Sequence, residues 1–217
     1  MTDIPDRCRI VLILPPGLGA RDAADRTAKA LSGGDVASVI VPQYALDAAA
    51  FQEIAAAVAP VAQAAGAAVV VAGDSRVAGR IGADGLHVEG SLADLAETID
   101  KHQAHMMIGA TGGKTRDDAL ERGERRPDYI FFGRFGFDTV PDPHPRNLSL
   151  GQWWAEVIEV PCIVLAGSDV ASVEAVAATG AEFVGLGNAV FADGVDPAEA
   201  VRGANEILDA AGPRFGG

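Results

Sequence analysis

The feature that most constrains the fold is a short unit that recurs along the whole chain: an apolar run, a turn rich in small residues, then a helical segment. The apolar runs are continuous rather than alternating, which is typical of strands that are covered by protein on both faces. A small-residue pair precedes several of them, as in Gly66-Ala67, Gly82-Ala83 and Gly180-Ala181. Repetition of one strand–helix unit favours a parallel sheet with right-handed crossovers.

Counting these units gives eight strands and about eight helices. The predicted strands are residues 9–14, 36–41, 67–72, 82–88, 105–109 and 128–132, with two more inside 161–190. The predicted helices are residues 22–31, 47–65, 77–81, 92–103, 114–122, 170–176 and 198–211, with a short one beginning at Trp153. Eight repeats favour a closed (β/α)8 TIM barrel of the α/β class over an open doubly wound sheet. No linker divides the chain, so residues 1–217 are predicted to form a single TIM-barrel domain.

Composition narrows the possible partners. The chain has 217 residues, of which 49% are hydrophobic, and a net charge of −13. This charge argues against a nucleic acid or an anionic membrane as partner, but it is compatible with a small phosphorylated ligand. No signal peptide is apparent, and no apolar stretch approaches the roughly 18 residues of a membrane span. We therefore expect a cytoplasmic protein, and a homo-oligomer is compatible with the sequence.

The last two strands are predicted to end in a phosphate site. Their apolar runs end in Gly167-Ser168 and in Gly187-Asn188. Turns of small residues after neighbouring parallel strands can present backbone N–H groups to an anion, and the last two turns of a TIM barrel are a frequent phosphate site. We predict that Gly167, Ser168, Gly187 and Asn188 bind phosphate; the alternative is that these glycines serve turn geometry alone.

Other strand ends carry candidate catalytic groups. His87 lies two residues before Glu89, and a histidine oriented by a carboxylate can shuttle protons near neutral pH. The alternative is a histidine that is hydrogen-bonded in the barrel rim. Thr111 and Asp74 also follow strands, but one carboxylate is a poor Mg²⁺ site without substrate phosphates. The metal ligands stay unknown.

Two basic residues are candidates for contacts to an anion. Lys114 lies in Gly113-Lys114-Thr115, which is similar to a P-loop, but the required earlier glycine is replaced by Ile108, so nucleotide hydrolysis is not expected. Arg134 directly follows the sixth strand and is the best single candidate for an anion ligand. It begins a long irregular stretch, residues 134–150, which we interpret as a lid or binding loop.

Several motifs together resemble thiamine phosphate synthase and its thiazole tautomerase relatives. They are residues 82–88, 108–111, 128–133 and 161–190, and the similarity covers about four fifths of the chain. The resemblance implies a TIM barrel that joins a pyrimidine pyrophosphate to a thiazole phosphate, uses Mg²⁺ and releases pyrophosphate. It also implies that Ala166-Gly167 and Asn188-Ala189-Val190 contact the thiazole phosphate.

The pyrophosphate half of that site departs from the family pattern. After the second strand the family carries Gln-x-Arg-x-Lys, whereas this chain has Val41-Pro42-Gln43-Tyr44-Ala45. The family's Asn-Asp pair after the third strand is replaced by Ala72-Gly73, with Asp74 displaced by one position. We therefore predict a degenerate pyrophosphate site, in which Lys114, Arg134 and Arg146 compensate from other loops. The tautomerase histidine aligns near Gly113, so that activity is not expected.

Two functional hypotheses follow. The first is a thiamine-phosphate-synthase-like transferase in thiamine biosynthesis, with Mg²⁺ implied only by the resemblance. The second is a related barrel that binds a phosphorylated ligand without coupling, as a carrier, a regulator or a different enzyme. An unrelated barrel enzyme, such as a phosphosugar isomerase or lyase, is a third possibility. A Schiff-base lyase is not expected, because no lysine lies inside a predicted strand.

Overall fold

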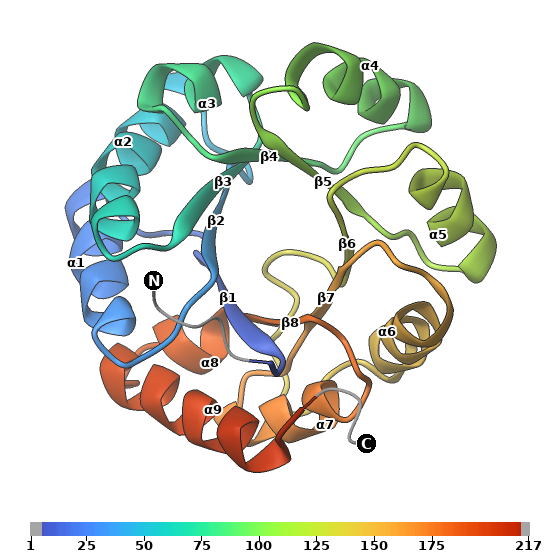
Figure 1. Cartoon of the computed structure of the whole chain (residues 1–217). Helices are drawn as coiled ribbons and strands as arrows, with labels where there is room; N and C mark the ends of the chain where they lie inside the picture. The colour runs from blue at the N-terminus through green and yellow to red at the C-terminus, as the bar shows by residue number, and fades with distance from the viewer. Residues whose placement is uncertain (1–5, 214–217) are drawn as a thin grey trace.

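The computed structural model describes residues 6–213 and shows a closed barrel of eight parallel strands in chain order, β1 to β8 (Figure 1). The strands are β1 Arg9–Ile13, β2 Ser38–Pro42, β3 Ala68–Ala72, β4 Gly85–Val88, β5 Met107–Thr111, β6 Tyr129–Phe132, β7 Cys162–Leu165 and β8 Phe183–Leu186. β1 pairs in parallel with both β2 and β8, which closes the sheet. The predicted (β/α)8 TIM barrel is confirmed.

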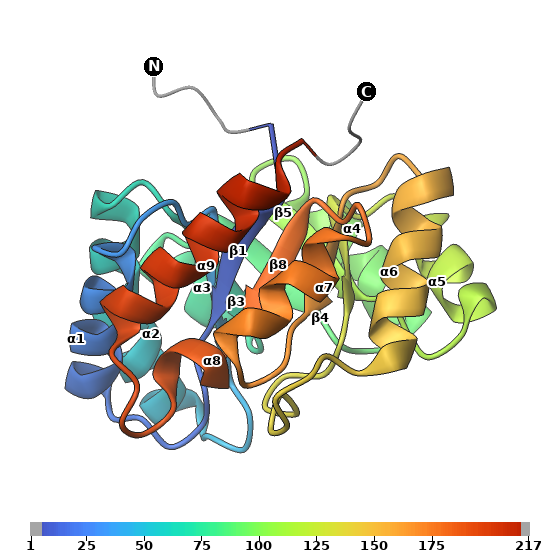
Figure 2. The same cartoon turned by 90° about the horizontal axis from the view of Figure 1, so that it is seen from below.

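Helices surround the barrel on its outside (Figure 1). They are α1 Ala20–Leu31, α2 Ala48–Ala64, α3 Ser75–Ile81, α4 Leu92–His102, α5 Arg116–Gly123, α6 Pro145–Val157, α7 Val173–Ala177, α8 Asn188–Phe191 and α9 Pro197–Ala211. The short α8 was not predicted. Figure 2 shows that the end of α9 and the loop between β6 and α6 lie at opposite ends of the barrel. None of the described helices is both long enough and apolar enough to cross a membrane.

Each strand buries both of its faces. In β1, Ile10 and Leu12 belong to the larger core cluster between barrel and helices, whereas Val11 and Ile13 belong to the cluster inside the barrel. Successive side chains of a strand point to opposite faces, so both sets must be apolar. This explains why the strands are continuous apolar runs in the sequence.

The loop after β6 is shorter than predicted. The prediction of an irregular stretch to Leu150, with a helix beginning at Trp153, is wrong because α6 begins at Pro145. Proline fits the first helical position, where its missing N–H is not needed. His144 caps the helix, since its Nδ1 accepts the N–H of Arg146 at 3.1 Å. The irregular segment therefore ends at His144.

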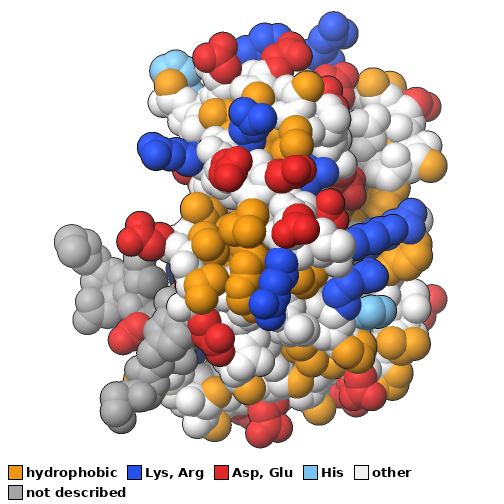
Figure 3. Space-filling view, turned by 90° about the vertical axis from the view of Figure 1, so that its right-hand side faces the viewer, with side chains coloured by type: hydrophobic (Ala, Val, Ile, Leu, Met, Phe, Trp, Pro, Cys, Tyr) orange, Lys and Arg blue, Asp and Glu red, His pale blue; other side chains and the backbone are white. Residues whose placement is uncertain are grey.

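The side of the barrel that carries α5 and α6 shows hydrophobic side chains gathered between charged ones (Figure 3). Val157 in α6 is 59% exposed and Leu120 in α5 is 39% exposed. Trp154, by contrast, is fully buried, and its Nε1 donates to the carbonyl of Val160 at 2.6 Å. Trp154 therefore belongs to the core. The expected homo-oligomer stays a prediction.

Candidate active site

A cavity with a volume of about 690 Å³ lies at the carboxyl ends of β5, β6 and β7. We call it the mouth cavity. Its wall contains three basic side chains from three segments: Lys114 after β5, Arg134 after β6, and Arg146 in α6. Enzymes with this fold keep their active sites at this end of the barrel. The cavity therefore occupies the expected position.

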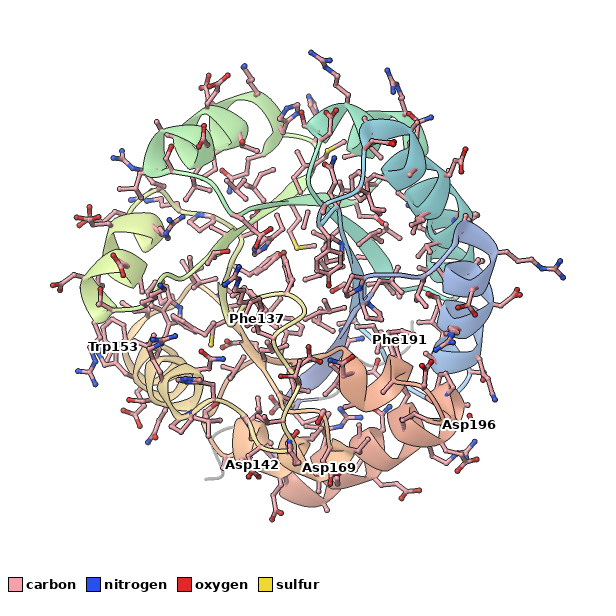
Figure 4. The ribbon with its side chains drawn as sticks, turned by 180° about the vertical axis from the view of Figure 1, so that it is seen from behind. Phe137, Asp142, Trp153, Asp169, Phe191 and Asp196 are labelled. Carbon is pink, nitrogen blue, oxygen red and sulfur yellow. The ribbon has the colours of Figure 1, made fainter. Side chains whose placement is uncertain are left out.

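The three basic side chains are exposed, and within residues 6–213 none of them forms an ion pair. The guanidinium of Arg134 lies 3.9 Å from the ring centroid of Phe137, a cation–π contact that holds it at the cavity wall. Figure 4 shows Phe137 near the middle of the barrel opening. The mouth cavity can thus present positive charge to an anionic ligand.

Acidic groups line the same cavity. Glu89, Asp138 and Asp142 are among its wall residues. Burial raises the pKa of Glu89, and the positive charge of Arg134 partly offsets this rise. The mixture of charges favours a ligand that carries both an anionic group and hydrogen-bond donors over a simple polyanion.

His87 lies below the mouth cavity, inside the barrel, and is 4% exposed. Its Nδ1 lies 3.0 Å from the hydroxyl of Tyr129, and its Nε2 lies 3.2 Å from the hydroxyl of Thr111. Burial lowers the pKa of His87 to about 3, with a smaller contribution from the charge of Arg122. The ring is therefore neutral at physiological pH, and its hydrogen bonds go to Tyr129 and Thr111 rather than to Glu89.

Phe135 also lies within the barrel opening. Its ring stacks on Phe131 at a centroid distance of 4.8 Å and meets the His87 ring edge-on at 5.0 Å. Phe135 is 5% exposed, so the loop after β6 places an apolar plug above the strand layer. Phe135 is not among the residues that line the mouth cavity, so the plug lies outside its wall.

The amides of the predicted phosphate site are bonded to the protein itself. The carboxylate of Asp138 accepts the backbone N–H of Asn188 at 2.5 Å. The N–H of Ser168 donates to the carbonyl of Val140 at 2.7 Å, and the N–H of Gly167 donates to the hydroxyl of Ser172 at 3.0 Å. Phosphate binding by Gly167, Ser168, Gly187 and Asn188 stays a prediction, and a phosphate would have to compete with these contacts.

Asp74 lies outside the mouth cavity. It is the N-cap of α3, where its carboxylate accepts the N–H of Arg76 at 2.9 Å. Its own N–H donates to the side chain of Gln43, which follows β2. Gln43 and Asp74 are the polar residues nearest in sequence to the polar positions that the family carries after β2 and β3. Both are thus held in local hydrogen bonds.

The described residues do not offer a metal cage. Within residues 6–213 no group of three or more His, Cys, Asp or Glu side chains is arranged to hold a metal ion. Mg²⁺ in nucleotide and diphosphate sites is commonly held by one or two carboxylates together with substrate oxygens. The Mg²⁺ implied by the resemblance therefore stays a prediction, and no step of the proposed chemistry depends on it.

Two parts of the site are not evident from the sequence. Tyr129, the partner of His87, lies in an apolar run, and the sequence predicts it only as part of a strand. In the structure Gly109 lies opposite it in the sheet and leaves room for its ring. The contact of Asp138 with Asn188 joins residues 50 positions apart, so no local sequence pattern predicts it.

The fold and the position of the mouth cavity define a TIM-barrel protein with its candidate site at the carboxyl end of the strands. A model of the family described as thiamine monophosphate synthase matches residues 10–190. The thiamine-phosphate synthase of Hyphomonas neptunium is 31% identical over 94% of this chain and 95% of its own length. That of Rhodospirillum centenum is 32% identical over 96% of this chain and 99% of its own length.

The chain therefore belongs to the thiamine monophosphate synthase family. Among solved structures, the thiamine phosphate pyrophosphorylase from Pyrococcus furiosus has the same fold, with a TM-score of 0.78 at 18% identity. The match covers 95% of this chain and 98% of that one. A 3-hexulose-6-phosphate synthase shares the fold with a TM-score of 0.71 at 20% identity, over 91% of this chain and 99% of that one.

Proposed function

We propose that the protein is a transferase that couples a pyrimidine diphosphate to a thiazole and releases diphosphate, with the diphosphate group bound in the mouth cavity. The observation that carries this proposal is the convergence of Lys114, Arg134 and Arg146 on one cavity of about 690 Å³, with none of the three in an ion pair within the described residues. The names of the two relatives that align over nearly the whole chain support the reaction class.

The chemistry needs positive charge where the leaving group departs. The bond between the pyrimidine's methylene carbon and the diphosphate oxygen breaks, and the diphosphate leaves with the electron pair, while the thiazole nitrogen forms the new bond to carbon. Fixed cationic donors stabilise the negative charge that develops on the leaving oxygens. Lys114, Arg134 and Arg146 are positioned to supply this charge in place of the residues that are absent after β2 and β3.

On this proposal the pyrophosphate site is degenerate at its family position after β2 and β3. Basic residues of the mouth cavity, on the other half of the barrel, take its place. The cavity at the ends of β1 and β2 has a volume of about 260 Å³ and is lined mainly by apolar residues such as Leu14, Pro16 and Leu46. Such a lining favours an uncharged group, because burying a diphosphate without donors is unfavourable.

A second function is favoured by a different observation. The backbone amide of Asn188, which the family resemblance assigns to the thiazole phosphate, is engaged with the carboxylate of Asp138. A barrel that binds a phosphorylated ligand without coupling does not need this amide to be free. On this alternative, the mouth cavity binds the ligand and no bond is made.

One experiment separates the two. The purified protein is incubated with the pyrimidine diphosphate, Mg²⁺ and either the thiazole phosphate or the thiazole alcohol, and both diphosphate release and the coupled product are measured. Product with either acceptor supports coupling, and its absence under every metal condition overturns it. Thermal stabilisation by inorganic diphosphate without product supports the second function.

A further inference from the structure

A buried carboxylate lies in the place predicted for phosphate. Asp138 is 5% exposed, and its Oδ2 accepts the backbone N–H of Asn188 at 2.5 Å. The side-chain amide of Asn188 donates in turn to the backbone carbonyl of Asp138 at 2.9 Å. A Cβ added to Gly187 would lie 2.7 Å from the same carboxylate oxygen, so the carboxylate lies directly against this turn.

The neighbouring turn after β7 is covered by the same segment. We call residues 138–141 the strap. The N–H of Ser168 donates to the carbonyl of Val140 at 2.7 Å, and the N–H of Asp169 donates to the carbonyl of Pro141 at 3.4 Å. A Cβ on Gly167 would lie 1.9 Å from the Pro141 carbonyl oxygen, so only glycine lets the strap pass this close.

Figure 4 shows the strap's course from the side of the barrel opening, with Phe137 before it near the centre and Asp142 after it beside Asp169. The strap therefore runs across both turns and fixes one end at each. Its contacts involve backbone donors on β7 and β8 turns that are 20 residues apart in sequence, Ser168 and Asn188.

The charge of Asp138 is balanced by peptide dipoles and not by a cation. Within the described residues it forms no ion pair. Burial raises the pKa of Asp138, and the N–H groups of Asn188 and Gly187 oppose this rise. The amides of these turns therefore already bind a carboxyl group in this structure, and that group is part of the chain.

Two anions cannot share these amides. A phosphate bound to the N–H groups of Gly187 and Asn188 would overlap the carboxylate of Asp138, and at such distances like charges in a buried site repel strongly. We propose that Asp138 is a specificity-determining residue that excludes phosphate from the turns after β7 and β8, so that the thiazole reaches the site as its unphosphorylated alcohol. The identity of the acceptor rests on the proposed coupling reaction, whereas the exclusion of phosphate does not.

The exclusion is tested with inorganic phosphate. Its affinity is measured by titration calorimetry for an Arg134→Met background, in which binding in the mouth cavity is weakened, with and without Asp138→Ala. We expect Asp138→Ala to bind phosphate at least about ten-fold more tightly, a difference of about 1.4 kcal/mol. Asp138→Asn removes the charge but keeps the shape, so a smaller gain is expected.

Equal affinity with Asp138 present and absent overturns the proposal, since it would mean that the strap moves aside or that phosphate binds elsewhere. A crystal soaked in phosphate locates the ion, and phosphate on Asn188 in the unsubstituted protein overturns it as well. Should Asp138→Ala fail to fold, as judged by circular dichroism, Asp138→Asn gives the same comparison with less disturbance of the packing.

The acceptor is tested separately by competition between the thiazole alcohol and the thiazole phosphate. We expect the unsubstituted protein to have the higher kcat/KM for the alcohol, and Asp138→Ala to shift the ratio toward the phosphate by about ten-fold or more. A preference for the phosphate in the unsubstituted protein contradicts the acceptor assignment. Lack of coupling with both acceptors refutes the proposed function, while the phosphate titration still decides the role of Asp138.

Discussion

The two halves of the barrel opening are built from the same strand–helix unit but differ in chemistry. The cavity at the ends of β1 and β2 is lined by Leu14, Pro16, Leu46 and other mainly apolar residues. The mouth cavity at the ends of β5 to β7 carries Lys114, Arg134 and further charged groups, and it is more than twice as large, about 690 Å³ against about 260 Å³. The repeated unit sets where a site can form, and the loops decide which half receives it.

Loop length is the physical origin of the difference. The turns after β1 and β2 are followed by α1 and α2 within a few residues, so their side chains remain near the strand ends. The loop from Gly133 to His144 is long enough to place Phe135 inside the barrel, Asp138 on the turn after β8, and Arg134 on the cavity wall. One loop thereby supplies both the plug and much of the charge.

The largest expected effect concerns the charged half. Replacing Arg134 by Met removes a fixed positive charge from the mouth cavity, and loss of one such donor lowers rates by roughly 10²–10³-fold. We expect kcat/KM for diphosphate release to fall by this factor in Arg134→Met. Arg21→Met is the matched control, because Arg21 is exposed on α1, where it pairs with Asp25, and lies outside the mouth cavity. An equal fall in kcat/KM for Arg134→Met and Arg21→Met would contradict the proposal that the diphosphate binds in the mouth cavity.

The second effect concerns the packing beneath the mouth cavity. A Cβ on Gly109 would lie 1.9 Å from Cζ of the Tyr129 ring, so Gly109→Ala forces the ring away from His87. We expect a loss of about 3 kcal/mol in the free energy of unfolding, measured by urea denaturation. Gly79→Ala in α3 is the control: no atom of a neighbouring element lies within 4 Å of the added Cβ, and a gain of about 0.5–1 kcal/mol is expected there. Equal stability of the two variants would contradict the tight contact.

Much of the barrel is predictable because its signals are local. The run at residues 128–132 predicts a strand and β6 is Tyr129–Phe132, since a buried parallel strand is marked by its own apolar composition. The start of α6 is not predicted because histidine is an unusual N-cap: His144 gives no strong signal before Pro145. A capping side chain contacts residues only two or three positions away. It can nevertheless be predicted from the sequence only when its residue type is a common N-cap.

The site is predictable only in part, for a different reason. The rule that chemistry collects at strand ends brings Lys114, Thr111 and Arg134 together, and the structure places all three on the mouth cavity. The rule carries no information on what a long loop will contact. The bond from Asn188 to Asp138 depends on how the loop folds across the opening, and hydrogen bonds between residues so far apart in sequence leave no periodic pattern.

The third effect separates a structural histidine from a proton shuttle. The pKa of His87 is lowered by burial to about 3 from its ordinary value of 6.5. Between these values the unfolded chain binds a proton that the folded chain does not, so stability is lost as pH falls below about 6.5. From pH 7.5 to pH 5 we expect His87 to contribute a loss of about 2 kcal/mol in the free energy of unfolding.

The measurement is urea denaturation at both pH values for the unsubstituted protein and for His87→Gln, which cannot be protonated. The pH-dependent loss should be smaller in the variant by that amount. Parallel pH dependence in the two proteins would show that His87 keeps its ordinary pKa in the folded state, and the barrel opening would then contain a group that titrates near neutral pH.

The smallest effect concerns the other half, where Asp74 caps α3. Its carboxylate accepts the N–H of Arg76 at 2.9 Å, and loss of an N-cap usually lowers stability by about 1 kcal/mol. We expect this loss in Asp74→Ala and little loss in Asp74→Ser, since serine also caps helices, with urea denaturation as the measurement. An activity loss in Asp74→Ser without a stability loss would place a polar function in the turn after β3. That outcome would mean that the mainly apolar half of the opening takes part in catalysis through the Asp74 carboxylate. The chemical contrast between the two halves would then be smaller than the cavity linings indicate.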